Sequence, residues 1–131
     1  MEQNEKTRAL LAAFGCALAY LLAGKVLTAV LPQVPEEAAR MWAFVHRCAA
    51  APIVEELVFR GAIQQLARPL GERQAVALQA VLFAVQHRGP AGMAYALVCG
   101  LVLGTIRSRT GSVWPGMLLH TLNNLLVFAA G

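Results

Sequence analysis

Residues 55–60 read Glu-Glu-Leu-Val-Phe-Arg and place two adjacent carboxylates and a guanidinium inside an otherwise apolar segment. Moving one carboxylate into hydrocarbon costs at least about 2.5–3.5 kcal/mol, even on lenient insertion scales. A chain that carries two in succession is expected to use the charge. The stretch therefore predicts a membrane helix that bears a functional site.

The composition is that of an integral membrane protein. Hydrophobic residues make up 58% of the 131 residues and charged residues 14%, whereas soluble domains are about 45–50% apolar and about 25% charged. The length gives room for one domain, residues 1–131. No basic run or basic–aromatic patch points to nucleic acid, so the net charge of +4 is better explained by membrane topology.

Five apolar segments predict an all-α, polytopic membrane bundle of about five helices, with turns rich in Pro and Gly between them. We expect Pro32 to close the first of them. The third segment is short for a membrane span, so it either ends within the membrane or borders a water-accessible cavity, since irregular backbone cannot face lipid. The five predicted helices are 9–31, 41–66, 74–87, 92–106 and 112–130.

Basic residues between these segments predict the orientation. With the N-terminus in the cytoplasm, six basic side chains fall inside and two outside, which satisfies the positive-inside rule. The Ala-, Leu- and Arg-rich usage suggests a bacterial source and hence the inner membrane. The inside set is Lys6, Arg8, Arg68, Arg73, Arg107 and Arg109, and the outside set is Arg40 and Arg88.

The second apolar segment separates its two carboxylates. Glu56 and Arg60 are four residues apart, so their side chains stack on one helix face, while Glu55 points about 100° away. Glu56 can then be neutralised by Arg60, which leaves Glu55 free to face a cavity. A carboxylate buried without a strong partner is a better base, which suits general-base catalysis.

Two further polar pairs lie in apolar segments at the same spacing. Phe83 and His87 form one pair, and His120 and Asn124 form the other, with Asn123 beside them. An imidazole and an amide on one helix face can both donate to a developing oxyanion, each contributing typically about 2.7–4 kcal/mol. Taken singly, such residues are more often structural glue between membrane helices. Together they suffice to hydrolyse an amide bond without a Ser or Cys nucleophile.

The three polar sets resemble a known family. Residues 55–60 match the motif EExxxR, residues 83–87 match FxxxH, and residues 120–124 match HxxxN, in that chain order. In this the chain is similar to the CAAX-protease and bacteriocin-processing (CPBP, or Abi) family of glutamic-type intramembrane endopeptidases. The resemblance covers roughly residues 50–126. Family members commonly have more membrane helices than the five expected here, which leaves a homo-oligomer or an accessory membrane partner as an open alternative.

The resemblance implies a function and a role for each motif position. The function is intramembrane hydrolysis of a peptide bond near the membrane-embedded or C-terminal part of a membrane-anchored substrate protein. Glu55 and His87 would activate the attacking water, and His120 and Asn124 would form the oxyanion hole. No cofactor is implied.

The remaining motif positions would support the site. Glu56 and Arg60 would form the supporting ion pair, and Phe83 would pack beside His87 without reacting.

Two alternatives stay open. Glu55, His87 and His120 could together bind a catalytic zinc ion, although the sequence has no HExxH pattern and the two His lie on different helices. A non-enzymatic membrane transporter or scaffold would use the same charged residues as a proton path.

Overall fold

The computed structural model describes residues 1–31 and 33–131, and in this part of the chain all regular structure is helical. The all-α prediction of five helices is therefore confirmed, with the second helix built from several consecutive pieces. Pro32, expected to close the first helix, lies outside the described residues. In chain order, the elements are α1 (Glu2–Val30), α2 (Glu36–Val45), η1 (His46–Ala50), α3 (Ala51–Glu55), η2 (Glu56–Ile63), α4 (Gln64–Leu66), η3 (Arg68–Leu70), α5 (Glu72–Ala84), α6 (Gly89–Thr110) and α7 (Trp114–Ala130).

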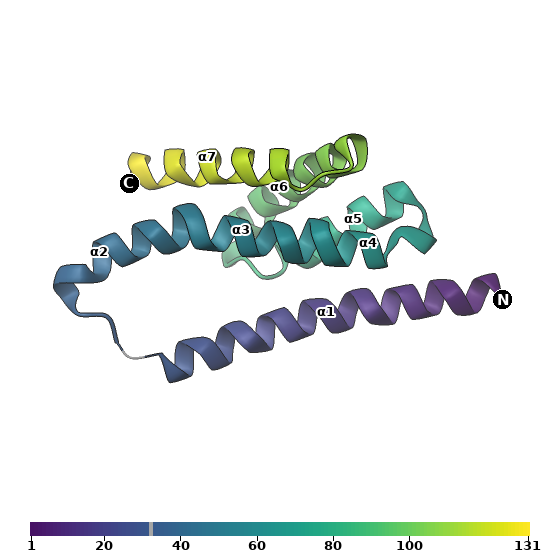
Figure 1. Cartoon of the computed structure of the whole chain (residues 1–131), viewed down its shortest axis with the longest axis horizontal. Coiled ribbons are helices and arrows are strands. Elements are labelled where there is room, and N and C mark those ends of the chain that lie inside the picture. The colour runs from purple at the N-terminus through teal and green to yellow at the C-terminus, as the bar shows by residue number, and fades with distance from the viewer. Residues whose placement is uncertain (32) are drawn as a thin grey trace.

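The long helix formed by α2 to α4 is the centre of the bundle. It runs between α1 on one side and α7 on the other, and α5 and α6 pack against its second half (Figure 1). The N-terminus and the C-terminus lie at opposite ends of the long axis (Figure 1). Because the central helix contacts every other helix, a side chain on any of its faces can meet a different partner.

Several helix ends differ from those expected from apolar patterning. The first helix begins at Glu2 and the central helix at Glu36, because acidic residues suit the first turn of a helix although they carry no apolar signal. The third helix ends at Ala84, so His87 lies beyond it. The fourth and fifth helices begin at Gly89 and Trp114, because Pro90 and Pro115 occupy first-turn positions where no N–H is required. The fourth ends only at Thr110, where Gly111, with a positive φ of 69°, closes α6 with a left-handed cap.

The central helix contains two π-helical segments, η1 and η2. Pro52 lies two residues after the end of η1. It lacks a backbone N–H, and its ring crowds the carbonyl one turn earlier, which disturbs the regular α-helical hydrogen bonds. The second π segment begins at Glu56, within the EELVFR stretch. Such segments are frequent at functional sites.

The most extensive helix contact joins α5 and α6, and small residues permit it. A Cβ added to Gly100 would lie 2.9 Å from both Cα and Cβ of Ala80, so only glycine allows the backbones to approach this closely. A hydrogen bond reinforces this contact: Nε2 of Gln79 on α5 donates to the carbonyl of Gly100 on α6 at 2.7 Å. The short α5 is thereby anchored through the longer α6.

Two helices, α1 and α6, are long and apolar enough to cross a membrane, with mean hydropathies of 2.0 and 1.6 over their best windows. The central helix is interrupted by π segments, and α5 at 13 residues is about 20 Å long, shorter than a hydrocarbon core of about 30 Å. A helix this short ends within the bilayer thickness. The chain is an integral membrane protein.

Candidate active site

A buried ion pair lies at the centre of the bundle. Glu56 and Arg60 are both fully buried, and their side chains approach to 3.0 Å between Oε1 and Nη1. His120 of α7 reaches the same carboxylate oxygen, with 2.9 Å between Nδ1 and Glu56 Oε1. The pairing within the central helix follows from the four-residue spacing. The contact with α7 joins residues 64 positions apart and depends on the tertiary fold.

Glycine in α7 makes the third contact possible. A Cβ added at Gly116 would lie 2.8 Å from Glu56 Oε2, so a larger residue there would displace the carboxylate. Gly116 is one helical turn before His120. The absence of a side chain at this position lets α7 come close enough for the imidazole to reach Glu56.

These contacts orient the imidazole of His120. Glu56 Oε1 lies between Arg60 and His120 and accepts from both, so Nδ1 of His120 is the donor in this contact. Nε2 of His120 lies 3.6 Å from Oε2 of Glu55, a second carboxylate. The ring of His120 thus lies between the two carboxylates of the EExxxR motif, with Nδ1 toward Glu56 and Nε2 toward Glu55.

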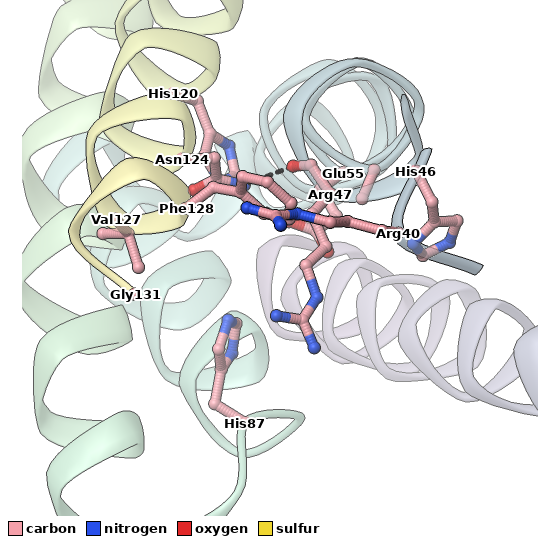
Figure 2. Close-up of a pocket in the computed structure, with 11 residues that line it drawn as sticks. Arg40, His46, Arg47, Glu55, His87, His120, Asn124, Val127, Phe128 and Gly131 are labelled. Carbon is pink, nitrogen blue, oxygen red and sulfur yellow. Dashed lines mark hydrogen bonds and ion pairs between the residues drawn. The ribbon is translucent and has the colours of Figure 1, made fainter. Parts of the chain in front are cut away.

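Glu55 occupies a different environment from Glu56. Its side chain is 21% exposed and lines a cavity of about 790 Å³ between the central helix, α7 and the end of α5 (Figure 2). Three imidazoles line the cavity, those of His46, His87 and His120. A peptide segment together with a water molecule fits a space of this size, since ligand pockets are typically about 300–1,000 Å³.

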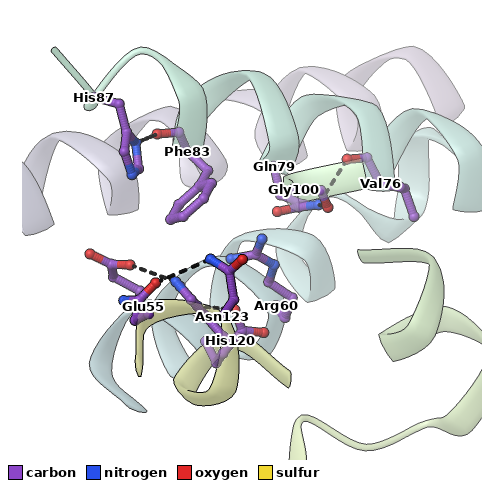
Figure 3. Close-up of polar contacts among 11 residues, drawn as sticks. Glu55, Arg60, Val76, Gln79, Phe83, His87, Gly100, His120 and Asn123 are labelled. Carbon is purple, nitrogen blue, oxygen red and sulfur yellow. Dashed lines mark hydrogen bonds and ion pairs between the residues drawn. The ribbon is translucent and has the colours of Figure 1, made fainter. Parts of the chain in front are cut away.

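His87 lies in the turn after α5, and its position is fixed by its own helix. Its Nδ1 is 3.0 Å from the carbonyl oxygen of Phe83, which can only accept, so Nδ1 carries the proton (Figure 3). In the neutral ring, Nε2 is then an acceptor. Because the ring lines the cavity, that acceptor is available to a water molecule there.

Asn124 lines the same cavity one turn after His120. Its Nδ2 donates to the carbonyl oxygen of Arg47 at 2.8 Å, which ties α7 to the central helix and leaves one amide hydrogen for another acceptor. The neighbouring Asn123 is held by the hydroxyl of Tyr95 on α6. Asn123 is therefore a structural link between α6 and α7.

Phe83 packs between the polar groups. Its ring centroid is 4.7 Å from that of His87 and 5.9 Å from that of His120, and Cζ of Arg60 lies 4.5 Å from it. One aromatic side chain thus contacts three of the polar motif residues. Cation–π contact and close packing hold both imidazole rings in place.

The fit of the site to a metal can be judged from its donors. Glu55 and His120 are neighbours, whereas His87 reaches the cavity from the other wall. Across residues 1–31 and 33–131, no three His, Cys or acidic side chains come close enough together to hold one ion. The set predicted for zinc is therefore not assembled as a ligand cluster.

Three polar residues of the cavity were not predicted as site residues: Arg40, His46 and Arg47. For Arg47 the available signal was spacing, because Arg47, Ala51 and Glu55 recur every four residues and share a helix face. The two arginines add positive charge to the lining that they share with Glu55.

An integral membrane helical bundle with an acid–imidazole cluster beside a cavity is the class that these observations define. A family model described as "Type II CAAX prenyl endopeptidase Rce1-like" matches residues 37–126, more than half of the chain. The chain therefore belongs to the Rce1-like family of type II CAAX prenyl endopeptidases. Membership indicates a membrane protease that acts on a protein substrate. No curated protein and no solved structure matches the chain.

Proposed function

We propose that this protein is a glutamic-type intramembrane endopeptidase with its active site in the cavity between the central helix, α5 and α7. The substrate is a membrane-anchored protein, cut near its membrane-embedded or C-terminal part. The observation that carries the proposal is the convergence of the three motifs. Three separate segments contribute the residues that line one cavity: Glu55, His87, and the pair His120 and Asn124.

The chemistry assigns a role to each of these groups. A water molecule donates to Glu55 and to the acceptor Nε2 of His87, which orients its lone pair toward the substrate carbonyl. Glu55 takes the water proton as the oxygen attacks, and a tetrahedral intermediate forms. The same proton passes to the leaving amine, so hydrolysis consumes one water and leaves Glu55 unchanged.

The developing oxyanion needs donors that are already in place. An N–H at Nε2 of His120 and the free amide hydrogen of Asn124 supply them from one helix face. Glu56 and Arg60 act indirectly: Arg60 fixes the carboxylate of Glu56, and Glu56 orients the imidazole of His120.

Replacement of the proposed base tests the mechanism. We expect Glu55→Gln to lower cleavage by about 10²–10⁴-fold, because the amide retains the shape and loses the proton acceptor. A deletion strain is complemented with wild type, Glu55→Gln or the exposed control Glu36→Gln, and uncleaved membrane proteins are identified by comparative proteomics. Wild-type processing by Glu55→Gln would refute the role of Glu55. No difference in processed membrane proteins between the deletion strain and wild type would favour a transporter or scaffold.

The reaction is proposed to be metal-free. Metal analysis of the purified protein tests this, together with activity measured after chelation. Stoichiometric zinc, with activity that is lost to the chelator and restored by zinc, would replace this mechanism by the zinc-dependent alternative with Glu55, His87 and His120 as ligands.

We further propose a bacterial inner-membrane location with the N-terminus in the cytoplasm, on the basis of the loop charges. Gly131 lines the cavity, and the two termini lie at opposite ends of the bundle (Figure 1). The cavity then opens toward the outer side of the membrane. A C-terminal alkaline phosphatase fusion should be active and a C-terminal green fluorescent protein fusion dark; the reverse result would overturn this orientation.

A further inference from the structure

A second, smaller cavity lies at the other end of the bundle. It has a volume of about 110 Å³ and sits between the end of the central helix, the start of α5 and the end of α6. At about 30 Å³ per water-sized group, it has room for roughly three or four such groups, which suits a phosphate group and excludes a peptide or a sugar. Its lining residues are Arg60, Gln64, Gln65, Arg68, Glu72, Arg107, Ser108 and Gly111.

Positive charge dominates this cavity. Three arginines line it against one carboxylate, Glu72, which is exposed and lies 3.7 Å from the Nε of Arg68. Glu72 also accepts a hydrogen bond from the hydroxyl of Ser108. Glu72 is thus already paired with its neighbours and can neutralise one of the three arginines. Of the two remaining positive charges, that of Arg60 is shared with Glu56.

Residues that line this cavity carry buried donors without partners. Arg60 is fully buried and Gln64 is 3% exposed, and both line the cavity. Within the described residues, Nε and Nη2 of Arg60 and Nε of Arg107 are buried and make no hydrogen bond. Gln64 is held with its Nε2 donating to Gly104 O and Ser108 Oγ, both at 3.0 Å. Buried donors in a built cavity call for an acceptor-rich ligand.

We propose that this cavity binds a phosphate group, supplied either by the headgroup of an anionic phospholipid or by free phosphate. Arg60 and Arg107 donate to the phosphate oxygens, and Arg68 supplies charge at the exposed rim. Basic pockets between membrane helices recognise headgroups in this way. The helix ends and turns around the cavity lie at one end of the bundle, where headgroups are found.

The site is separate from the catalytic cavity and connected to it through one side chain. Arg60 contacts Glu56 on one side and lines the phosphate cavity on the other. A bound phosphate would restrain the guanidinium of Arg60, and Arg60 in turn would restrain Glu56 in its contact with His120.

Binding is measured on the purified full chain, so the result does not depend on the proposed protease activity. Protein in nanodiscs of phosphatidylcholine and phosphatidylglycerol is released and analysed by native mass spectrometry for retained lipid. Protein in neutral detergent is titrated with inorganic phosphate and followed by thermal shift. Retention of phosphatidylglycerol without a response to phosphate assigns a lipid headgroup, and the converse assigns free phosphate.

Three variants sharpen the test. Arg107→Gln should weaken binding by about tenfold or more, because a charge-assisted hydrogen bond is lost. Glu72→Gln should strengthen it, because the one repelling carboxylate is removed. Arg109→Gln removes the same charge from the same turn without lining the cavity and should leave binding within about twofold. Equal effects of Arg107→Gln and Arg109→Gln, or binding of neither probe by the wild type, would overturn the proposal.

Discussion

The buried Glu56–Arg60 pair gives the sharpest prediction about stability. Arg60→Met keeps most of the volume of the arginine stem and removes the charge that lies 3.0 Å from Glu56. An unpaired buried charge costs about 3–5 kcal/mol. The cation–π contact with Phe83, at 4.5 Å, adds about 0.5–2 kcal/mol to the loss.

His120 limits this loss because it remains 2.9 Å from the same carboxylate oxygen. We therefore expect a decrease in the free energy of unfolding near the lower end, about 3 kcal/mol. In the double variant Glu56→Gln/Arg60→Met no isolated carboxylate remains, so part of the lost stability should return.

The assay is reversible unfolding in mixed detergent–SDS micelles, followed by circular dichroism and by the fluorescence of Trp42 and Trp114. The control Arg109→Met removes an exposed arginine and should change the free energy of unfolding by no more than about 0.5 kcal/mol. The reasoning fails if Arg60→Met costs no more than this control, or if the double variant is as unstable as Arg60→Met.

Two glycines give further predictions with matched controls. Gly100→Ala would place a Cβ 2.9 Å from the backbone of Ala80 and should lower the free energy of unfolding by about 1–3 kcal/mol. The control Gly15→Ala, with open space around it, should be neutral or stabilising. Equal stability of the two variants would contradict the close α5–α6 contact. Gly116→Ala would push Glu56 away from His120 and should slow cleavage by about 10²-fold. Gly61→Ala, where the added Cβ has only ordinary contacts, should cleave at the wild-type rate, and equal rates in the last two variants would show that the Glu56–His120 contact is dispensable.

Local patterns were enough to predict the helices. Helical hydrogen bonds connect residues four positions apart, so apolar runs broken by Pro and Gly mark five helices without knowledge of their partners. The same locality placed Glu56 beside Arg60 and turned Glu55 away from them. Helix ends were predicted less well, because the polar first turns at Glu2 and Glu36 and the first-turn Pro90 and Pro115 lie outside the apolar signal.

The site required more than local information. The contact between Glu56 and His120 spans 64 positions and depends on the missing side chain of Gly116. His87 reaches the cavity because α5 ends at Ala84 and the turn redirects the chain. The cavity that Arg40, His46 and Arg47 help to line and the phosphate-sized cavity at the other end also arise only where separate helices meet.

The sequence by itself determined that this is a helical membrane protein with three polar motifs, and it determined which side chains share a helix face. Periodicity and the cost of charge in hydrocarbon suffice for both, because each acts within one segment. Only the tertiary structure decided that Glu56 is held by both Arg60 and His120 while Glu55 faces a cavity with His87 and Asn124. That division depends on how closely helices can approach, which is fixed by small residues and turns in other parts of the chain.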